Sequence, residues 1–338
     1  MRLPSSTSRE FHALWVQEAL GSTTKLARSV LALVGAGMMD IESAVQSGRC
    51  EGSATHMSMK VVRALANTQA RALNTWEELR KAGVVVVAAW DDRYPQRLTA
   101  GLAEERPPVL FCKGNLGLLD KPGVGFCGSR RASPLGIAVA QDCARQVAAS
   151  GYNVVSGNAR GVDIAAHSAA LAAMGTTTVV LSEGILRYKL KPEMFSQIDM
   201  ERTLIVSQFH PKSVWCAGYA MTRNLTIIGL TDAMVVVEAG PTGGTFHAGV
   251  SSLRIGRPLF AADYAHNGDT NSGNAILIGR GAIPLRKDPT NGQANLGEIL
   301  RLLRNRSLHY EYREPAQQAL FPAYVSDRKS GGGHTPRE

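Results

Sequence analysis

One stretch of the chain, residues 123–167, restricts the possible folds more than any other, because short apolar runs alternate in it with segments of helical spacing. The first run, Val124 to Cys127, is bounded by glycines and is typical of a buried strand. Ser133 and Pro134 favour the start of a helix, and Gly151 favours its end. A second apolar run and an alanine-rich helix follow. The stretch therefore predicts a βαβα unit of a parallel sheet.

Each of the two predicted strands is followed by a glycine turn that carries an arginine. The turns are Gly128-Ser129-Arg130 and Ser156-Gly157-Asn158-Ala159-Arg160. Ligands of open parallel sheets bind outside the carboxyl ends of the strands, where helix N-termini present free N–H groups and partial positive charge. Arg130 and Arg160 add full charges at this edge. The sequence therefore predicts an anion site, which we interpret as a site for phosphate groups.

The same residues argue against the usual phosphate-containing cofactors. The first turn follows the pattern GxxGSR instead of the dinucleotide fingerprint GxGxxG. Ser156 and Gly157 stand where an NAD site would place an acidic residue for the ribose. The P-loop pattern GxxxxGK[ST] does not occur. We expect a Rossmann-like sheet without a bound cofactor.

Two further segments are candidates for contacts with phosphate. A second glycine-rich turn follows the apolar run 233–237, and its residues Gly243, Gly244 and Thr245 would begin another helix. In the segment Arg187-Tyr188-Lys189-Leu190-Lys191, basic residues that include Lys189 and Lys191 flank the aromatic Tyr188, a mixture that suits a nucleic-acid backbone with a stacked base. A solvated loop explains this second segment equally well.

Composition narrows the class of protein. The net charge of +9 over 338 residues indicates a tendency to bind polyanions, although a basic protein without a nucleic-acid role fits it equally well. Five scattered cysteines without a CxxC pair favour a reducing cytosol, with neither disulfides nor zinc. There is neither an apolar run of membrane-spanning length nor the apolar core of a signal peptide. We expect a cytoplasmic protein.

The pattern of helices and strands divides the chain into three parts. Residues 1–81 are predicted to form a small helical domain, which could bind DNA or serve as a packing or protein-contact module. Residues 82–290 carry the extended α/β repeat. Residues 291–338 are predicted to contain a last amphipathic helix and a flexible tail.

Candidate catalytic residues exist, but no constellation of them is convincing. Asp163 and His167 are four residues apart and share a helix face, yet a helix cap and a packed histidine explain them better than a base or half a metal site. Glu238 ends a predicted strand without a nucleophile beside it. Ser129 lies outside a GxSxG pattern. We expect no catalysis and no metal.

Taken together, the motifs resemble the DprA/Smf family of DNA-processing proteins of natural transformation. The stretches that carry the resemblance are Asp91-Asp92-Arg93-Tyr94-Pro95, Gly128-Ser129-Arg130, Ser156 to Asp163, Arg223-Asn224, Gly229-Leu230-Thr231-Asp232, Val236-Val237-Glu238-Ala239 and Gly279-Arg280-Gly281-Ala282. Their order and spacing hold over roughly residues 80–290. The resemblance implies an extended Rossmann domain that binds and protects single-stranded DNA in the cytoplasm, often as a dimer, and helps to load the RecA recombinase. It places DNA contacts at Gly128, Ser129, Arg130, Ser156, Gly157, Arg160, Arg223 and Asn224.

The chain departs from the family pattern at three points. Leu225 follows Arg223-Asn224 where the family often has a second arginine, residues 187–191 replace a Tyr-Pro segment, and the tail is too short for a winged helix. These changes leave open a role outside competence, such as phage defence beside a toxin partner, with sensing of DNA or of a nucleotide-derived signal. The fold also resembles phosphoribohydrolases, but Ala248 stands where their catalytic acid would be, so we favour that activity least.

Overall fold

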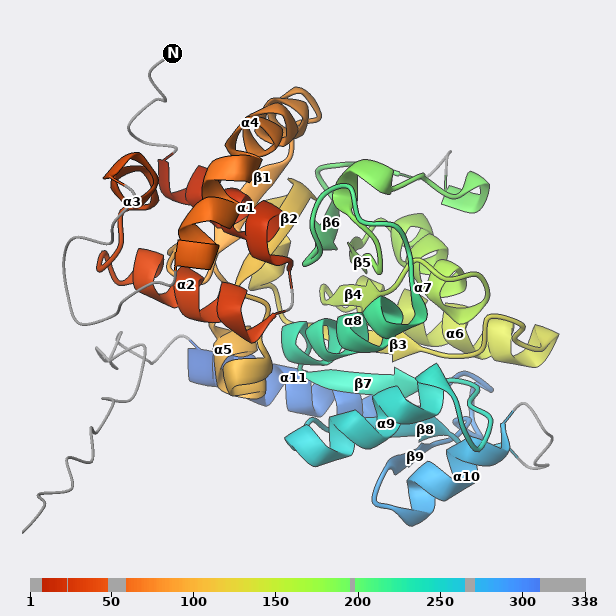
Figure 1. Cartoon of the computed structure of the whole chain (residues 1–338). Coiled ribbons are helices and arrows are strands. Elements are labelled where there is room, and N and C mark those ends of the chain that lie inside the picture. Colours follow the sequence, from red (N-terminus) through yellow and green to blue (C-terminus); the bar gives the residue numbers. More distant parts are fainter. Residues whose placement is uncertain (1–7, 23, 48–58, 195–197, 265–270, 311–338) are drawn as a thin grey trace, which may run out of the picture.

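The protein, seen here in a computed structural model that describes residues 8–22, 24–47, 59–194, 198–264 and 271–310, is built on one sheet of nine strands. The strand order is β1-β2-β6-β5-β4-β3-β7-β8-β9 (Figure 1). The strands are β1 Val85–Ala88, β2 Val109–Gly114, β3 Gly123–Cys127, β4 Asn153–Ser156, β5 Thr176–Val180, β6 Thr203–Ser207, β7 Ala233–Val236, β8 Leu259–Ala262 and β9 Ile283–Leu285.

The order of the strands reverses between β3 and β7. From β3 the chain adds β4, β5 and β6 on one side, and it then returns to add β7, β8 and β9 on the other, with all these neighbours parallel. Beyond β6, β2 pairs antiparallel with β6, and the edge strand β1 pairs antiparallel with β2. The prediction of a doubly wound, mostly parallel sheet is therefore confirmed, and the β3–β7 boundary is its topological switch point.

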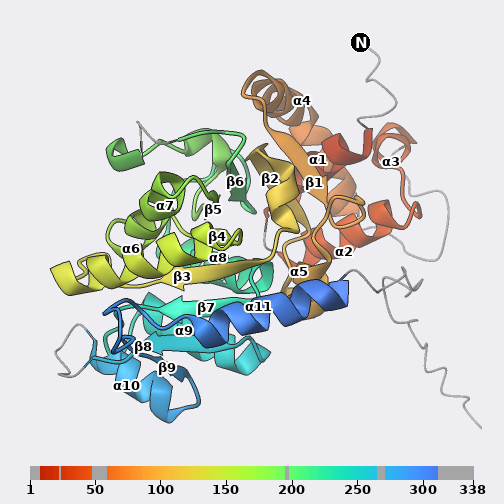
Figure 2. The same ribbon diagram turned by 180° about the vertical axis from the view of Figure 1, so that it is seen from behind.

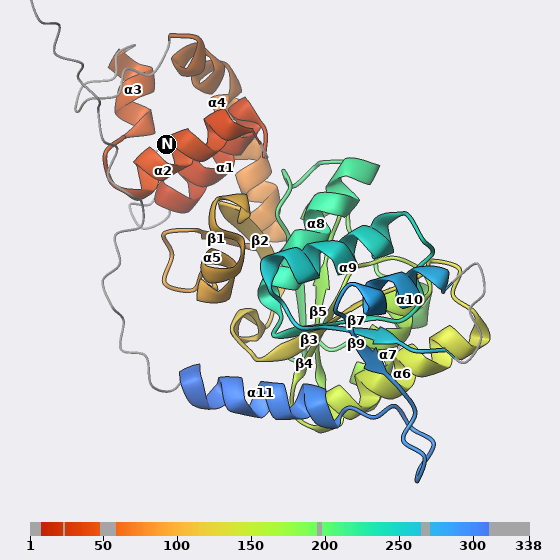
Figure 3. The ribbon, with the colours of Figure 1, turned by 90° about the horizontal axis from the view of Figure 1, so that it is seen from below.

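Helices cover both faces of the sheet, as Figure 3 shows from below. Neighbouring strand residues alternate between the two faces: Val154 belongs to an apolar core that includes residues of α6, α7 and α11, whereas Val155 belongs to one that includes residues of α5, α8, α9 and α10. This alternation gives each face its own apolar core. The helices are α5 Gln96–Leu102, α6 Pro134–Ala149, α7 Val162–Ala172, α8 Ala217–Leu230, α9 Gly244–Ile255, α10 Ser272–Gly279 and α11 Gly297–Tyr310.

The predicted signals at the ends of α6 are confirmed. Ser133 is the N-cap and its hydroxyl accepts the N–H of Gly136, Pro134 occupies the first helical position, and Gly151 follows the helix with φ +84°. Two elements were not predicted. The seven-residue α5 follows Pro95, and the three-residue β9 contains Pro284, which an edge strand tolerates because one of its sides needs no partner.

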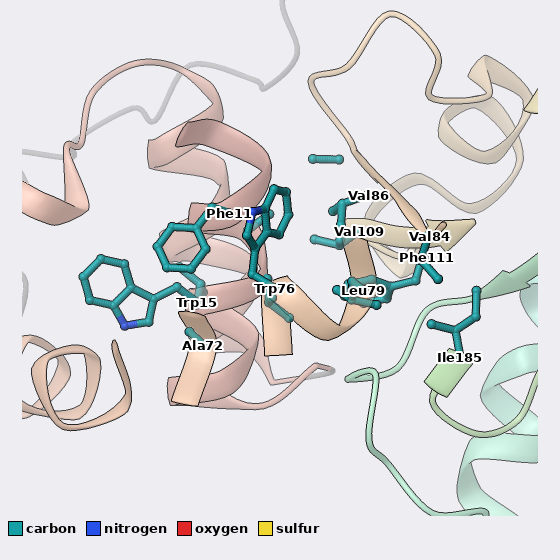
Figure 4. Packing of buried hydrophobic residues seen from close by; sticks show 14 of the residues in the cluster. Phe11, Trp15, Ala72, Trp76, Leu79, Val84, Val86, Val109, Phe111 and Ile185 are labelled. Carbon is teal, nitrogen blue, oxygen red and sulfur yellow. The ribbon is translucent and has the colours of Figure 1, made fainter. Parts of the chain in front are cut away.

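The N-terminal helices, together called the helical domain, are α1 Ser8–Leu20, α2 Lys25–Gly35, α3 Ile41–Ser47 and α4 Met59–Lys81. Their apolar core continues onto the sheet. Figure 4 shows this continuity, which runs through Phe11, Trp15, Trp76, Leu79, Val109 and Phe111. The apolar run Val84 to Ala89 supplies β1 at the end of the sheet, where the helical domain covers it.

The last helix, α11, lies against the sheet beside β7 and β8 (Figure 2). Its buried residues Ile299 and Leu303 share a core with Phe260 of β8. The flexible tail is predicted to begin at Tyr310, which is the last residue of α11; residues 311–338 lie outside those that the structure describes, and so does Cys50. Cys112, Cys127, Cys143 and Cys216 are free, and no helix in the described ranges is long and apolar enough to cross a membrane.

Candidate nucleic-acid interface

The turn after β3 and the turn after β4 lie in direct contact. Gly161, at φ +79°, begins α7, and a side chain there would collide with the carbonyl oxygen of Ser129. The backbone N–H of Val162 donates to that same oxygen at 3.4 Å. Gly128 likewise lacks room for a side chain because Val162 fills the space. The two predicted anion turns therefore form one unit at the carboxyl edge of the sheet.

Arg130 and Arg160 extend from this unit with exposed side chains. Within the described ranges, neither arginine has a carboxylate within 4 Å, whereas many other arginines of the surface are paired. Arg130 follows β3 and Arg160 follows β4, its parallel neighbour, and α7 begins at Val162, two residues after Arg160. The structure therefore brings both arginines to the same edge of the sheet, where neither faces a carboxylate of the described residues.

An exposed tryptophan, Trp215, lies beside Arg130. The guanidinium carbon of Arg130 is 5.4 Å from the ring centroid, and 47% of the tryptophan surface is exposed. Sequence reasoning did not select Trp215 as a site residue. The signal that could have found it is the aromatic residue among Lys212, Ser213 and Cys216 in an irregular connection between a strand and a helix.

Tyr188, the predicted stacking residue, does not present an open ring. It packs at the edge of the core below the helical domain, and burial raises the pKa of its hydroxyl to about 12. Lys189 is exposed and Lys191 is half-buried beyond the carboxyl end of β5. In the sheet, β5 is the direct neighbour of β4, whose turn carries Arg160, and lies two strands, about 10 Å, from β3, whose turn carries Arg130.

Arg223, predicted as a DNA contact, lies beneath the turns instead. Its side chain is buried, and Nη1 is 3.7 Å from Oδ2 of Asp163. Burial lowers the pKa of Arg223, and the charge of Asp163 opposes that shift. The guanidinium fills the space beside Gly157 in which a side chain would otherwise stand. The arginine therefore supports the β4 turn from below and does not reach a ligand at the surface.

His167 also supports this turn. The ring is fully buried, with Nε2 2.7 Å from the carbonyl oxygen of Gly157 and Nδ1 2.6 Å from Oγ1 of Thr177. Burial lowers the pKa of His167, which favours the neutral ring. In that form Nε2–H donates to the carbonyl oxygen of Gly157, and Nδ1 lies beside the hydroxyl of Thr177, which donates to the carbonyl oxygen of Val154 at 2.8 Å. The packed, hydrogen-bonded histidine that the sequence favoured is confirmed.

Two expectations about neighbouring side chains were wrong. Asp163 is not the cap of α7, because Gly161 occupies that position; the Asp163 carboxylate accepts the backbone N–H of Ala159 at 3.2 Å instead. Ser156 is fully buried, and its hydroxyl donates to the carbonyl oxygen of Phe126 at 2.7 Å. The Ser156 side chain therefore joins β4 to β3 and is not available to DNA.

The glycine turn at the start of α9, Gly243-Gly244-Thr245, is linked to the turn after β3. The hydroxyl of Thr245 donates to the carbonyl oxygen of Gly128 at 3.1 Å, and the amide of Asn224 donates to that of Gly244 at 3.3 Å. Gly243 and Gly244 are exposed at the start of α9. The predicted anion site after β3 and β4 and the predicted phosphate contacts at the start of α9 therefore lie at one edge, and Asn224 and Thr245 connect them.

Glu238 occupies the switch point itself. The carboxylate is buried and accepts the backbone N–H of Ser133 at 2.9 Å and the hydroxyl of the same residue. It also lies against Gly136, whose missing side chain would come within 2.5 Å of the carboxyl carbon. An internal anion thus fills the N-terminus of α6, where a dinucleotide fold would bind phosphate. Both carboxylate oxygens of Glu238 are buried and accept hydrogen bonds from Ser133, so neither is exposed to act as a general base.

Comparison with known proteins yields a consistent result. The family model described as DNA recombination-mediator protein A matches residues 85–291. The chain is 32% identical over 200 residues to Protein Smf of Synechocystis, covering 53% of this chain and 50% of that protein. It is 32% identical over 210 residues to the DNA processing protein DprA of Streptococcus pneumoniae, covering 62% and 72%. The chain thus spans half the length of the Synechocystis relative.

Solved structures show the same fold. The X-ray structure of DprA from Streptococcus pneumoniae superposes with a TM-score of 0.67 at 22% identity, over 84% of this chain and 95% of that chain. DNA processing protein A from Helicobacter pylori, described with a single-stranded DNA binding mode of its own, gives a TM-score of 0.53 at 23% identity, over 68% and 97%.

Proposed function

The chain belongs to the DNA recombination-mediator protein A family, and from this premise we propose that it binds single-stranded DNA at the edge formed by the β3 and β4 turns. The observation that carries the proposal is the contact between these turns, which brings two exposed and uncompensated arginines to one edge. Guanidinium groups bind phosphate in forked geometry, and the N-terminus of α7 adds N–H donors. The edge suits successive phosphates of one strand.

A preference for single strands follows from Trp215. A base can stack on an exposed indole only when it is not held in a base pair, and such stacking contributes about 1–3 kcal/mol per base. The ring stands 5.4 Å from the guanidinium carbon of Arg130. A phosphate on Arg130 and its unpaired base on Trp215 would belong to the same stretch of strand. No feature of the edge suggests base-specific readout.

We further propose that the protein protects such DNA and passes it to a RecA-type recombinase, as a homodimer and without catalysis of its own. The family relationship supports this role. The internal bonds of His167, Asp163 and Glu238 support the absence of catalysis, because each candidate acid or base is already engaged. Glu238 also argues against a small nucleotide at the switch point, because its carboxylate occupies that position.

Binding of labelled single- and double-stranded oligonucleotides at several salt concentrations tests the proposal. Wild-type protein should favour the single strand, and affinity should fall with salt. The double variant Arg130→Ala and Arg160→Ala should bind more weakly and lower the slope of log K against log salt by about 1.4, since each phosphate contact of a single strand contributes about 0.7.

Arg254→Ala provides the matched control for one lost charge. Arg254 is exposed at the end of α9 and pairs with Glu105 at 3.2 Å, at the opposite edge from the turns. This variant should keep the wild-type slope. The single variants Arg130→Ala and Arg160→Ala should each lose more affinity than Arg254→Ala. An equal loss of affinity in all three would contradict a defined binding site. Displacement of the oligonucleotide by mononucleotides would favour a nucleotide sensor instead.

A further inference from the structure

The segment between β6 and α8, Gln208–Cys216, is held from outside the sheet domain by the helical domain. The backbone N–H of His210 donates to the hydroxyl of Ser22 at 2.6 Å, and Nε2 of its ring lies 2.6 Å from Oε2 of Glu18. Lys212 pairs with Glu78 of α4 at 2.7 Å. Ser22 and Glu18 are largely buried, so the two His210 contacts are shielded from water.

The same segment holds the turn that follows β5. Backbone N–H groups of Gly184 and Leu186 donate to the carbonyl oxygens of Ser213 at 2.9 Å and Pro211 at 3.0 Å. Nε of Arg187 donates to the Lys212 carbonyl at 3.3 Å. The basic residues beyond β5 therefore depend on the position of residues 210–213.

At its far end the segment presents Trp215 to Arg130. The sheet domain fixes both ends of the segment: Phe209 is fully buried and stacks on Tyr219 with 4.1 Å between ring centroids, and Cys216 caps α8. Between these anchors, His210 contacts Ser22 and Glu18 of the helical domain, and Lys212 contacts Glu78. The middle of the segment is thus braced by the helical domain.

We propose that the helical domain positions the DNA-binding edge, with Glu18 and Ser22 as positioning residues that hold the Gln208–Cys216 segment and, through it, Trp215 and the turn after β5. The proposal rests on the proposed binding of single-stranded DNA. It assigns the helical domain a role in binding that requires no contact between that domain and DNA. Ordering the segment in advance avoids an entropic cost on binding, because the residues of the segment no longer have to be fixed when DNA binds.

The sign of the effect separates positioning from simple electrostatics. Loss of Glu18 removes a negative charge, and the more positive protein would bind a polyanion more tightly if charge alone mattered. Positioning predicts the opposite, because the segment would no longer be held in its binding arrangement. Glu77→Ala makes the same change of charge on the same domain, at an exposed pair with Arg80 that does not touch the segment.

The experiment compares the double variant Glu18→Ala and Ser22→Ala with Glu77→Ala in the full chain, using a fluorescently labelled oligodeoxythymidylate. We expect the dissociation constant of the double variant to rise about tenfold, as it would if about one tenth of the molecules kept the competent segment. Glu77→Ala should bind at least as tightly as wild type. Amide hydrogen exchange should become faster in peptides that span residues 208–216 of the double variant.

Two single variants keep the test decisive. Glu18→Gln retains an oxygen that accepts Nε2–H of His210, so it should restore binding close to the wild-type level. Ser22→Ala removes one hydroxyl and should show faster exchange and weaker binding even if the double variant does not fold. Binding of Ser22→Ala and the double variant as tight as that of Glu77→Ala would overturn the proposal. If wild type itself failed to bind the oligonucleotide, the proposed function would fall, which is a different result.

Discussion

The guanidinium group of Arg223 occupies the space beside Gly157 that a side chain at position 157 would need. Arg223 comes from α8 and Gly157 from the turn after β4, and Nη1 of the arginine is 3.7 Å from Asp163 at the start of α7. The absence of one side chain therefore allows a buried ion pair to form directly under the proposed DNA-binding turn. Gly157 is required for this packing, although its φ is not positive.

Gly157→Ala should consequently destabilise the protein strongly. The new methyl group would displace Arg223 and separate it from Asp163, and breaking a buried ion pair typically costs about 3–5 kcal/mol. Urea unfolding should show this loss in the free energy of unfolding. Gly244→Ala is the matched control, because no atom lies within 4 Å of its missing side chain. A similar unfolding midpoint for both variants would show that Arg223 can move aside at little cost.

The sequence revealed this region only in part. The glycine turns, the arginines that follow them and the start of α6 all depend on local signals, and the structure has them as predicted. The burial of Arg223 depends on packing between α8 and a turn more than sixty residues earlier in the chain, and no local pattern distinguishes it from an exposed arginine. The order of strands around β3 likewise follows from crossovers that a strand pattern does not encode.

Trp215 and Tyr188 show the same limit for aromatic residues. Both follow or precede basic residues in irregular segments, so composition treats them alike. The difference arises because the core under the helical domain takes up Tyr188, whereas the segment that ends at α8 leaves Trp215 exposed beside Arg130. Which aromatic ring could meet a base was therefore decided by tertiary packing.

Stability should fall in mild acid because of His167. Burial lowers its pKa in the folded protein, while the unfolded chain titrates near the ordinary value of about 6.5. Above that pH both states are neutral and the residue has no effect. As pH falls below it, the unfolded chain takes up a proton that the folded ring resists. Stability then declines by up to about 1.4 kcal/mol per pH unit for one proton, until the folded pKa is reached.

Urea unfolding of wild type and His167→Gln between neutral and mildly acidic pH measures this effect. The amide of glutamine does not titrate in this range, so the decline should be shallower in the variant. Some decline should persist, because burial also lowers the pKa of His12. Parallel pH profiles for the two proteins would contradict a neutral, buried His167.

Met174 offers a way to stabilise the protein. It follows α7 with φ +58°, in the left-handed region that favours glycine, and 74% of its surface is exposed. Gly256 takes the same role after α9 with φ +75°. Met174→Gly should raise the free energy of unfolding by about 1 kcal/mol, and Gly256→Ala should lower it by about the same amount. Thermal unfolding should show shifts of opposite sign; a lower melting temperature for Met174→Gly would contradict the argument.

The internal anion at the switch point leads to the last prediction. Glu238→Ala leaves the N-terminus of α6 without the carboxylate that accepts from Ser133, and it opens a small cavity beside Gly136. Loss of a buried charged acceptor together with packing should cost about 2–4 kcal/mol of the free energy of unfolding.

If the Glu238 carboxylate stands where related folds hold a phosphate, a small anion should refill the site in Glu238→Ala. Acetate or phosphate should then raise the melting temperature of Glu238→Ala more than that of wild type at equal ionic strength, with chloride as the reference salt. Gly136→Ala, which crowds the same position without vacating it, should gain nothing from either anion. Equal responses of Glu238→Ala and wild type to acetate, phosphate and chloride would mean that Glu238 merely caps a helix and that no anion cradle lies beneath it.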